Sequence, residues 1–289
     1  MSDNKTIAIT GATGSLGQEL VAQMLPKFNI IAISRDERKQ AQMQQRFRHV
    51  NYVIADVRDS KALLRSFRNI DYVIHCAAMK RIDSCGDNPL EAISTNILGA
   101  QNVIDAAVHN GVKKVLAISS DKACHPSNVY GASKLCADYL FIHANSGTRF
   151  STVRMGNFYG SRGSVQEYWD ELWYHGERKL PLTHPDMTRF YIRLKDAAKF
   201  TIQCLEIMNG GEIFTPKMER LKITSLAPID AEFIITGIRN GEKLHEKLIT
   251  AEDARNTIER DDFYVTFPNG IPDNVVGIRV SEGFEYTSG

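Results

Sequence analysis

Residues 6–17 read TIAITGATGSLG, an apolar run followed by glycines at positions 11, 14 and 17. We predict a strand over Thr6–Thr10 and a helix that opens within the glycine segment and ends near Leu25. Glycines in this pattern permit a tight turn, close backbone approach to a pyrophosphate and close packing of helix on strand. Because N–H groups at a helix start bind anions, the stretch predicts a dinucleotide-binding loop. The alternative is a turn that is merely rich in small residues.

The alternation of strand and helix continues through the first half of the chain. Further strands are predicted at residues 30–34, 52–55, 72–76 and 115–118, and helices at residues 35–46 and about 89–110. This order favours an α/β fold with a doubly wound, Rossmann-like parallel sheet, whose strands all end along one edge. Beyond about Asn157 the alternation weakens. We expect a dinucleotide-binding domain with the catalytic residues over 1–156 and mainly a smaller substrate-binding lobe over 157–289, interleaved in one structural unit.

Composition excludes several classes of protein. The net charge is +1, so no overall field draws the chain to nucleic acid or to an acidic membrane surface. Five cysteines without a CxxC pair predict neither a disulfide framework nor a zinc site. No apolar run approaches the roughly 20 residues of a membrane span, and none follows the N-terminus as in a signal peptide. We expect a soluble, cytoplasmic protein without a metal.

Groups able to move protons follow the strand predicted at residues 115–118. Asp121 and Lys122 come directly after Ser119 and Ser120, and Tyr130 and Lys134 stand four positions apart. On a helix this spacing places both side chains on one face. An ammonium close to a tyrosine lowers the phenol pKa and suits it to proton transfer. The alternative for Asp121 and Lys122 is an ordinary ion pair at a strand end.

The end of the second predicted strand bears on the choice of cofactor. An acidic residue there binds the ribose diol of NAD, whereas arginine accommodates the 2′-phosphate of NADP. Both are present, as Arg35 and Asp36, with Lys39 just beyond. The cations favour NADP, and NAD is the alternative. Asp36 also suits the N-cap of the next helix, and Asp56 suits either an adenine contact or an N-cap.

Residues 10–17 together with the Tyr130 and Lys134 pair resemble the extended short-chain dehydrogenase/reductase family. Within it the chain is most similar to the inverting UDP-N-acetylglucosamine 4,6-dehydratases of pseudaminic acid and polysaccharide biosynthesis. The similarity extends to about Ile249 and rests on SRDE (34–37), AAMK (77–80), NPLE (88–91), SDKA (120–123), GSRGSV (160–165), MTRF (187–190) and GIRNGEKLHE (237–246). Ser120 and Asn240 depart from the threonine and proline usual in that group.

The resemblance implies a reaction and a role for each catalytic residue. Oxidation at C4 of the sugar acidifies the C5 proton, a base removes it, an acid protonates the departing C6 hydroxyl, and hydride returns to C6. Tyr130 with Lys134 would serve the C4 hydroxyl, and Lys134 would also hold the nicotinamide ribose. Lys122 would be the base at C5, Asp121 the acid at C6, and Ser120 a hydrogen-bond partner of the sugar.

The resemblance also implies which residues form the cofactor site and which form the substrate site. The cofactor residues are expected to be Gly11, Thr13, Gly14, Ser15, Leu16, Gly17, Ser34, Arg35, Asp36, Lys39, Asp56, Val57, Ala77, Ala78, Lys80, Tyr130 and Lys134. The substrate residues are expected to be Lys80, Asn96, Asn157, Arg162, Thr188, Arg189, Arg239 and Glu242. The three arginines match the UDP diphosphate, because guanidinium groups bind phosphate oxygens in pairs. A surface position is the alternative for each arginine and for Asn96, and His245 is expected to be structural.

Other functions remain open at this stage. The enzymatic alternatives are a nucleotide-sugar 4-epimerase and a dehydratase that retains the C5 configuration. An NADP-binding sensor without catalysis is the alternative from a different class. The acid and base at Asp121 and Lys122 favour the dehydratase, since an epimerase has no use for them. The resemblance further implies a homo-oligomer, either a dimer or a hexamer.

Overall fold

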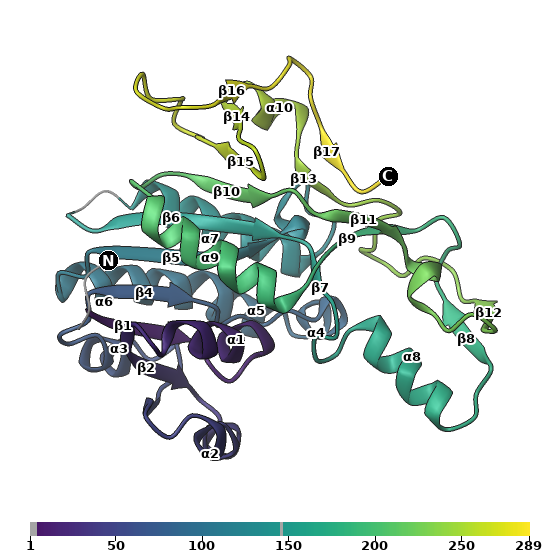
Figure 1. The fold of residues 1–289 in the computed structure, drawn as a ribbon, viewed down its shortest axis with the longest axis horizontal. Helices are drawn as coiled ribbons and strands as arrows, with labels where there is room; N and C mark the ends of the chain where they lie inside the picture. The colour runs from purple at the N-terminus through teal and green to yellow at the C-terminus, as the bar shows by residue number, and fades with distance from the viewer. Residues whose placement is uncertain (1–4, 145–146) are drawn as a thin grey trace.

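The computed structural model describes residues 5–144 and 147–289. Seven strands lie parallel in its main sheet: β1 (Lys5–Thr10), β2 (Phe28–Ser34), β3 (Asn51–Ile54), β4 (Tyr72–His75), β5 (Lys114–Ser120), β6 (Arg149–Met155) and β10 (Ile213–Pro216). Three antiparallel strands extend it beyond β10: β14 (Thr257–Glu259), β15 (Phe263–Thr266) and β16 (Ile278–Arg279). The order is β16-β14-β15-β10-β6-β5-β4-β1-β2-β3 (Figure 1). The predicted α/β fold with a doubly wound sheet is confirmed.

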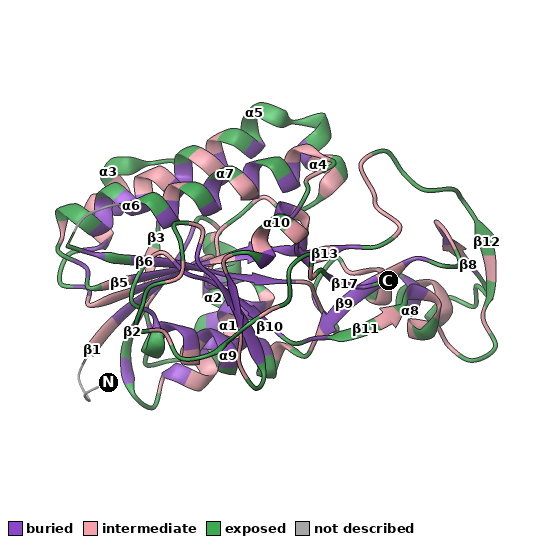
Figure 2. Ribbon diagram, turned by 90° about the horizontal axis from the view of Figure 1, so that it is seen from above, coloured by how far each residue is buried: buried purple, intermediate pink, exposed green. Residues whose placement is uncertain are grey.

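Helices cover both faces of this sheet (Figure 2). One hydrophobic cluster joins the sheet to α3 (Ser60–Ser66), α6 (Gly99–His109) and α7 (Val129–His143). The other joins it to α1 (Ser15–Met24), α2 (Glu37–Arg46) and α9 (Leu194–Ile207). The helices and strands predicted from the sequence in the first half lie within two residues of the observed ones.

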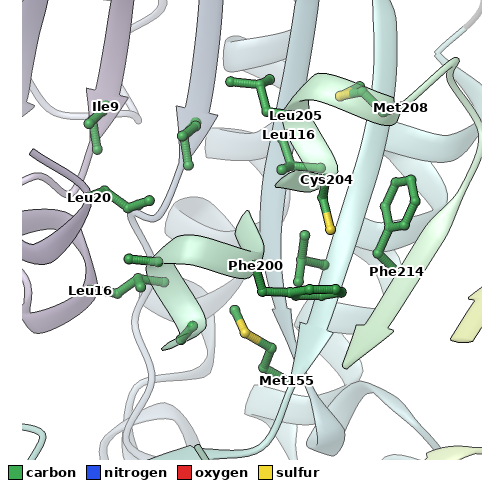
Figure 3. Close-up of a cluster of buried hydrophobic side chains, with 14 of the residues drawn as sticks. Ile9, Leu16, Leu20, Leu116, Met155, Phe200, Cys204, Leu205, Met208 and Phe214 are labelled. Atoms are coloured by element: carbon green, nitrogen blue, oxygen red, sulfur yellow. The ribbon is translucent and has the colours of Figure 1, made fainter. Parts of the chain in front are cut away.

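The core beneath α1 and α9 joins the two halves of the chain. Leu16 and Leu20 from α1 lie in one cluster with Phe200 and Cys204 from α9, against strand residues such as Leu116 (Figure 3). Leu20, Cys204 and Leu116 are fully buried. Because α9 and β10 come from the second half, residues on both sides of position 156 share this core.

The long helix predicted over residues 89–110 contains a change of helical type. It begins as α5 (Pro89–Ala92), continues as a π-helical turn over Ile93–Leu98 and then becomes α6. Such turns insert a residue into the helical ladder and change which side chains face inward. Here they turn both Thr95 and Asn96 into the interior.

The lobe lies beyond the carboxyl ends of the parallel strands, at the right of Figure 1. Its elements are β7 (Asn157–Phe158), α8 (Val165–Tyr174), β8 (Lys179–Leu182), β9 (Thr188–Ile192), β11 (Glu219–Lys222) and β12 (Glu232–Ile235). Trp169, Leu180 and Leu182 form its small core. The remaining α-helices and strands of the described residues are α4 (Ile82–Asp87), β13 (Lys247–Ile249), α10 (Ala251–Ala254) and β17 (Tyr286–Thr287). Within residues 5–144 and 147–289, no helix is both long and apolar enough to span a membrane.

Candidate active site

The loop between β1 and α1 is shaped to receive a phosphate group. Gly11 has a φ of +67°, and a Cβ on it would lie 2.7 Å from the backbone nitrogen of Ala77. A Cβ on Gly17 would lie 2.6 Å from the Gly11 oxygen. Gly14, the N-cap of α1, offers no capping side chain, so the N–H groups of the first turn are open to an anion. The loop therefore fits a dinucleotide pyrophosphate.

A cleft of about 1220 Å³ runs from this loop along the carboxyl ends of the parallel strands to the lobe. All the residues predicted to bind the cofactor line it, and so do Ser120 and Lys122. Of the predicted substrate residues, the cleft is lined by Lys80, Asn157, Arg162, Arg189, Arg239 and Glu242. The fold thus brings one group of positions together from both halves of the chain.

Asp121 and Lys122 occupy a short 3₁₀ turn directly after β5. Asp121 is fully buried behind the cleft wall, and its Oδ1 accepts from Lys122 Nζ and from the Ser120 hydroxyl, both at 3.0 Å. Its Oδ2 has no hydrogen-bond partner in the described part of the chain. Burial would lower the pKa of Lys122, but the carboxylates of Asp121 and Glu246 outweigh burial and raise it. In the protein without bound ligands, Lys122 is therefore an ammonium at neutral pH.

Tyr130 and Lys134 lie on α7, whose N-cap Asn128 accepts a hydrogen bond from Gly131. The expected lowering of the Tyr130 pKa by Lys134 is wrong for the chain alone. Burial raises the pKa of Tyr130, opposed by a hydrogen bond to Ser120 and by the charge of Lys122. Lys134 Nζ instead donates to the carbonyl of Ile118 at 2.6 Å, and burial lowers its own pKa.

The charged groups at the end of β2 are already partly committed. Asp36 is the N-cap of α2, where it accepts from the Lys39 backbone and pairs with Lys39 Nζ at 3.0 Å. Asp56 is held by Arg58 at 2.7 Å and lies 3.8 Å from Arg35. The Arg35 side chain remains 67% exposed at the cleft. Arg35 is therefore the group here with most freedom to meet a ligand.

The three arginines expected to meet a diphosphate have different surroundings. Arg162 reaches from the lobe to the phosphate loop, where its guanidinium donates to the carbonyl of Thr13. Arg189 is buried and donates to the carbonyls of Thr188 and Leu244. Arg239 pairs with Glu242 at 2.6 Å and with Asp83 at 3.4 Å, so a phosphate would have to displace these carboxylates.

Two expected substrate residues, Asn96 and Thr188, do not line the cleft. Asn96 is 2% exposed, and its amide bonds the backbone of Met79 and the hydroxyl of Ser133. It therefore joins the tail of β4 to α7. The Thr188 hydroxyl bonds His245 Nδ1 and Ser288, which gives His245 a structural contact.

Glu246 is a buried acid that was not predicted as a site residue from the sequence. Its side chain is buried, and its carboxylate lies 3.7 Å from Lys122 Nζ and 3.2 Å from Lys243 Nζ. Glu246 ends the GIRNGEKLHE segment, and that position was the only signal available before the fold was known. Among residues 5–144 and 147–289, no group of His, Cys, Asp and Glu suits a metal ion.

The dinucleotide cradle and the tyrosine–lysine pair on the adjoining helix define an extended short-chain dehydrogenase/reductase. The sequence profile of the polysaccharide biosynthesis protein family matches residues 7–268, and the chain belongs to that family. It is 45% identical to a UDP-N-acetylglucosamine 4,6-dehydratase (inverting) of Campylobacter jejuni, over all of this chain and 93% of that protein.

Two further comparisons place the chain among its relatives. The X-ray structure of Pen from Bacillus thuringiensis superposes with a TM-score of 0.92 at 34% identity, over all of this chain and 94% of that one. A UDP-glucose 4-epimerase of Rickettsia typhi is 36% identical over 90% of this chain and 82% of its own length. The family thus contains relatives with different named activities, and the site must distinguish them.

Proposed function

We propose that the protein is an NADP-dependent UDP-N-acetylglucosamine 4,6-dehydratase that inverts C5. The observation that carries this proposal is a lysine paired with a buried carboxylate at 3.0 Å, in the same cleft as Tyr130 and the phosphate cradle. Elimination of water across C5 and C6 needs both a base and an acid. The similarity to the Campylobacter jejuni enzyme supports the sugar and the stereochemistry.

Each residue of the site has a proposed task. A bound nicotinamide would accept the hydride from C4 and later supply the hydride that returns to C6. Tyr130 exchanges the proton of the C4 hydroxyl, with Ser120 in hydrogen-bond contact with it. Once C4 is a ketone, Lys122 takes the C5 proton, the C–H electrons form the C5–C6 double bond, and the C6–O bond breaks. Before this step the Lys122 ammonium passes a proton to Asp121 along their 3.0 Å hydrogen bond. The amine is then neutral, and Asp121 gives its proton to the departing group, which leaves as water.

The binding groups surround this centre. We place the nicotinamide ribose at Lys134, the pyrophosphate at the loop of residues 11–17, and the UDP diphosphate among Arg162, Arg189 and Arg239. The lining of one continuous cleft by these groups supports the arrangement. The Thr13 contact of Arg162 lets the same side chain close the lobe over the cofactor phosphates.

The preference for NADP rests on Arg35. Since Asp36 caps α2 and is paired with Lys39, its carboxylate is poorly placed to accept hydrogen bonds from a ribose diol. We expect Arg35→Ala to weaken NADP binding by about tenfold or more and to change NAD binding by less than about threefold, because a guanidinium–phosphate pair is lost. Isothermal titration with each dinucleotide measures this effect. Arg38→Ala, in the first turn of α2 three positions after Arg35 and outside the cleft lining, is the matched control. Equal losses for NADP and NAD would contradict the assignment.

The function is tested by proton NMR of the purified protein with UDP-N-acetylglucosamine in deuterated water. A 4-keto-6-deoxy product with deuterium at C5 and L-arabino geometry is expected. D-xylo geometry would retain the chemistry and overturn inversion. No reaction with NADP bound would favour the sensor or a different sugar.

A 4-epimerase is the second candidate, because the Rickettsia typhi relative covers most of the chain. The same NMR experiment separates the two. An epimerase yields a sugar inverted at C4 that keeps its C6 hydroxyl and takes up no deuterium at C5. The dehydratase yields a methyl signal at C6.

The resemblance also leaves two predictions outside the site. Association into a dimer or hexamer is tested by size-exclusion chromatography with light scattering. A cytoplasmic location is tested by fractionating cells that express the natural gene.

A further inference from the structure

Glu246 is a buried acid at a fixed place beside the cleft. It comes directly before β13, and its backbone N–H donates to the Ser288 hydroxyl at 2.9 Å. The Ser288 N–H in turn donates to the Glu246 carbonyl at 2.8 Å. The pairing of β13 with β17 continues this contact. The backbone of Glu246 is thus held by a segment from the far end of the sequence, and the residue is 2% exposed.

Its carboxylate faces two lysines with different surroundings. Lys122, on one side, lines the cleft, and its Nζ lies 3.7 Å from Glu246 Oε1. Lys243, on the other, lies 3.2 Å from Oε2 and donates to the carbonyl of Cys124 at 2.8 Å. Lys243 does not line the cleft, and it forms its ion pair with the carboxylate oxygen that Lys122 does not approach.

Lys122 consequently stands between two buried carboxylates from distant parts of the chain. The Asp121 carboxylate, in the same 3₁₀ turn as Lys122, lies 3.0 Å from Lys122 Nζ. The Glu246 carboxylate, from the residue before β13, lies 3.7 Å from Nζ. Among the described residues, further groups that act on Lys122 electrostatically include Arg189 and Tyr191 on β9 and Tyr130 on α7. Of these, Arg189 opposes the ammonium. Glu246 is therefore the carboxylate partner that does not already have a proposed task in the elimination.

We propose that Glu246 is a positioning residue that holds the Lys122 amine at the cleft and controls its charge. The inference rests on the proposed dehydratase function, in which Lys122 is the base at C5. A base must be neutral before the proton moves and is an ammonium afterwards. A carboxylate at 3.7 Å favours the ammonium, so it makes Lys122 a stronger base and also delays its loss of a proton as the pH rises.

The test is the pH profile of kcat for Glu246→Gln, which removes the charge but keeps the shape. Without Glu246 the burial of Lys122 is less compensated, so the amine becomes neutral at lower pH. We expect the rising limb of the profile to move about one to three pH units towards acid. The plateau should fall by tenfold or more, because the amine is a weaker and less ordered base.

Two controls separate this role from a structural one. Glu246→Asp keeps the charge and should return the rising limb most of the way to its original pH, with a reduced plateau. Glu212→Gln removes another buried carboxylate, which binds Ser151 and the loop at residues 209–210, outside the cleft lining. It should lower stability and leave the profile in place. A Glu246→Gln profile at its original pH would overturn the proposal, however much kcat falls.

A second readout does not depend on the substrate. The carbon-13 chemical shift of Lys122 Cε, assigned by its loss in Lys122→Arg, is followed against pH in the holoenzyme. Its midpoint should fall in Glu246→Gln by the same amount as the rising limb. An unchanged midpoint overturns the proposal even if the protein is active. A lowered midpoint in a protein inactive on UDP-N-acetylglucosamine would contradict only the proposed function.

Discussion

Two clusters in this protein have the same arrangement of charges but different cations and surroundings. In each, one cation lies between two carboxylates from different elements. Lys122 lies 3.0 Å from Asp121 and 3.7 Å from Glu246. Arg154 on β6 lies 3.4 Å from Asp138 on α7 and 3.3 Å from Asp253 on α10. The Lys122 side chain is 15% exposed and lines the cleft, whereas Arg154 is 4% exposed and does not.

The cation itself explains the different uses of these clusters. A lysine amine loses its proton within an accessible range of pH, but a guanidinium stays charged in proteins. The cluster at the cleft therefore suits a group that takes and returns a proton. The cluster behind it fixes the positions of β6, α7 and α10 with a permanent charge. Ser119, at the end of β5, donates to Asp138 at 2.8 Å and links the two clusters through one strand end.

Lys122→Arg gives the cluster at the cleft a guanidinium as its cation, as in the Arg154 cluster. It keeps a cation between Asp121 and Glu246 but removes the base, so turnover should fall by about 10²–10⁴-fold. The free energy of unfolding should change by less than about 1 kcal/mol, since the charge is retained. Dehydratase assays and urea titration with NADP bound measure both effects.

The matched control for this change is Lys114→Arg. Lys114 lies at the other end of β5, outside the cleft lining, and donates to the carbonyls of Leu205 and Glu206. It should keep turnover within about threefold of the original. Full activity of Lys122→Arg would show that Lys122 is not the base.

Arg154→Met breaks the second cluster. It leaves Asp138 buried without its main cation, which should cost about 3–5 kcal/mol of unfolding free energy. Urea denaturation measures the loss, and Arg154→Lys, which keeps a charge, should recover part of it. The pH profile of the residual activity should keep its position, because Arg154 does not reach the cleft. A shifted profile would mean that the two clusters titrate together.

Local patterns were sufficient to predict the strand-and-helix order and the residues after each strand. The phosphate loop at residues 11–17, the charged residues after β2 and the pair Tyr130 and Lys134 each consist of residues close in sequence. Their spacing was therefore enough to predict each group. Glu246 meets Lys122 because the chain just before β13 packs against the turn after β5, a contact between distant parts of the sequence that no short pattern encodes. The burial of Asn96 could not be seen in the sequence, because it lies in a π-helical turn that directs the side chain inward. The expected lowering of the Tyr130 pKa was wrong because burial raises that pKa, and because Lys134 bonds to a backbone carbonyl; spacing shows neither.

A third cluster shows how exposure changes the outcome. Asp71 lies at the opposite end of the strands, 2.8 Å from Lys113 and 3.3 Å from Lys5, and it accepts from the Thr6 N–H at 3.0 Å. Burial would raise the pKa of Asp71, but the hydrogen bonds from Lys113, Thr6 and Lys5 outweigh it and lower the pKa. Water screens these contacts more than those of Arg154, because both lysine side chains are substantially exposed.

Asp71→Asn should therefore cost only about 0.5–1 kcal/mol at pH 7. A carboxyl whose folded pKa is lowered stabilises the fold above its unfolded value of about 3.9, and the contribution is lost as the pH falls through the lower folded value. The difference between the original protein and Asp71→Asn should be constant from pH 7 to pH 5 and shrink below pH 4, as measured by urea titration. It should also shrink in 1 M salt, which screens exposed pairs. A cost as large as that of Arg154→Met, or one that ignored pH and salt, would mean that Asp71 acts through packing rather than charge.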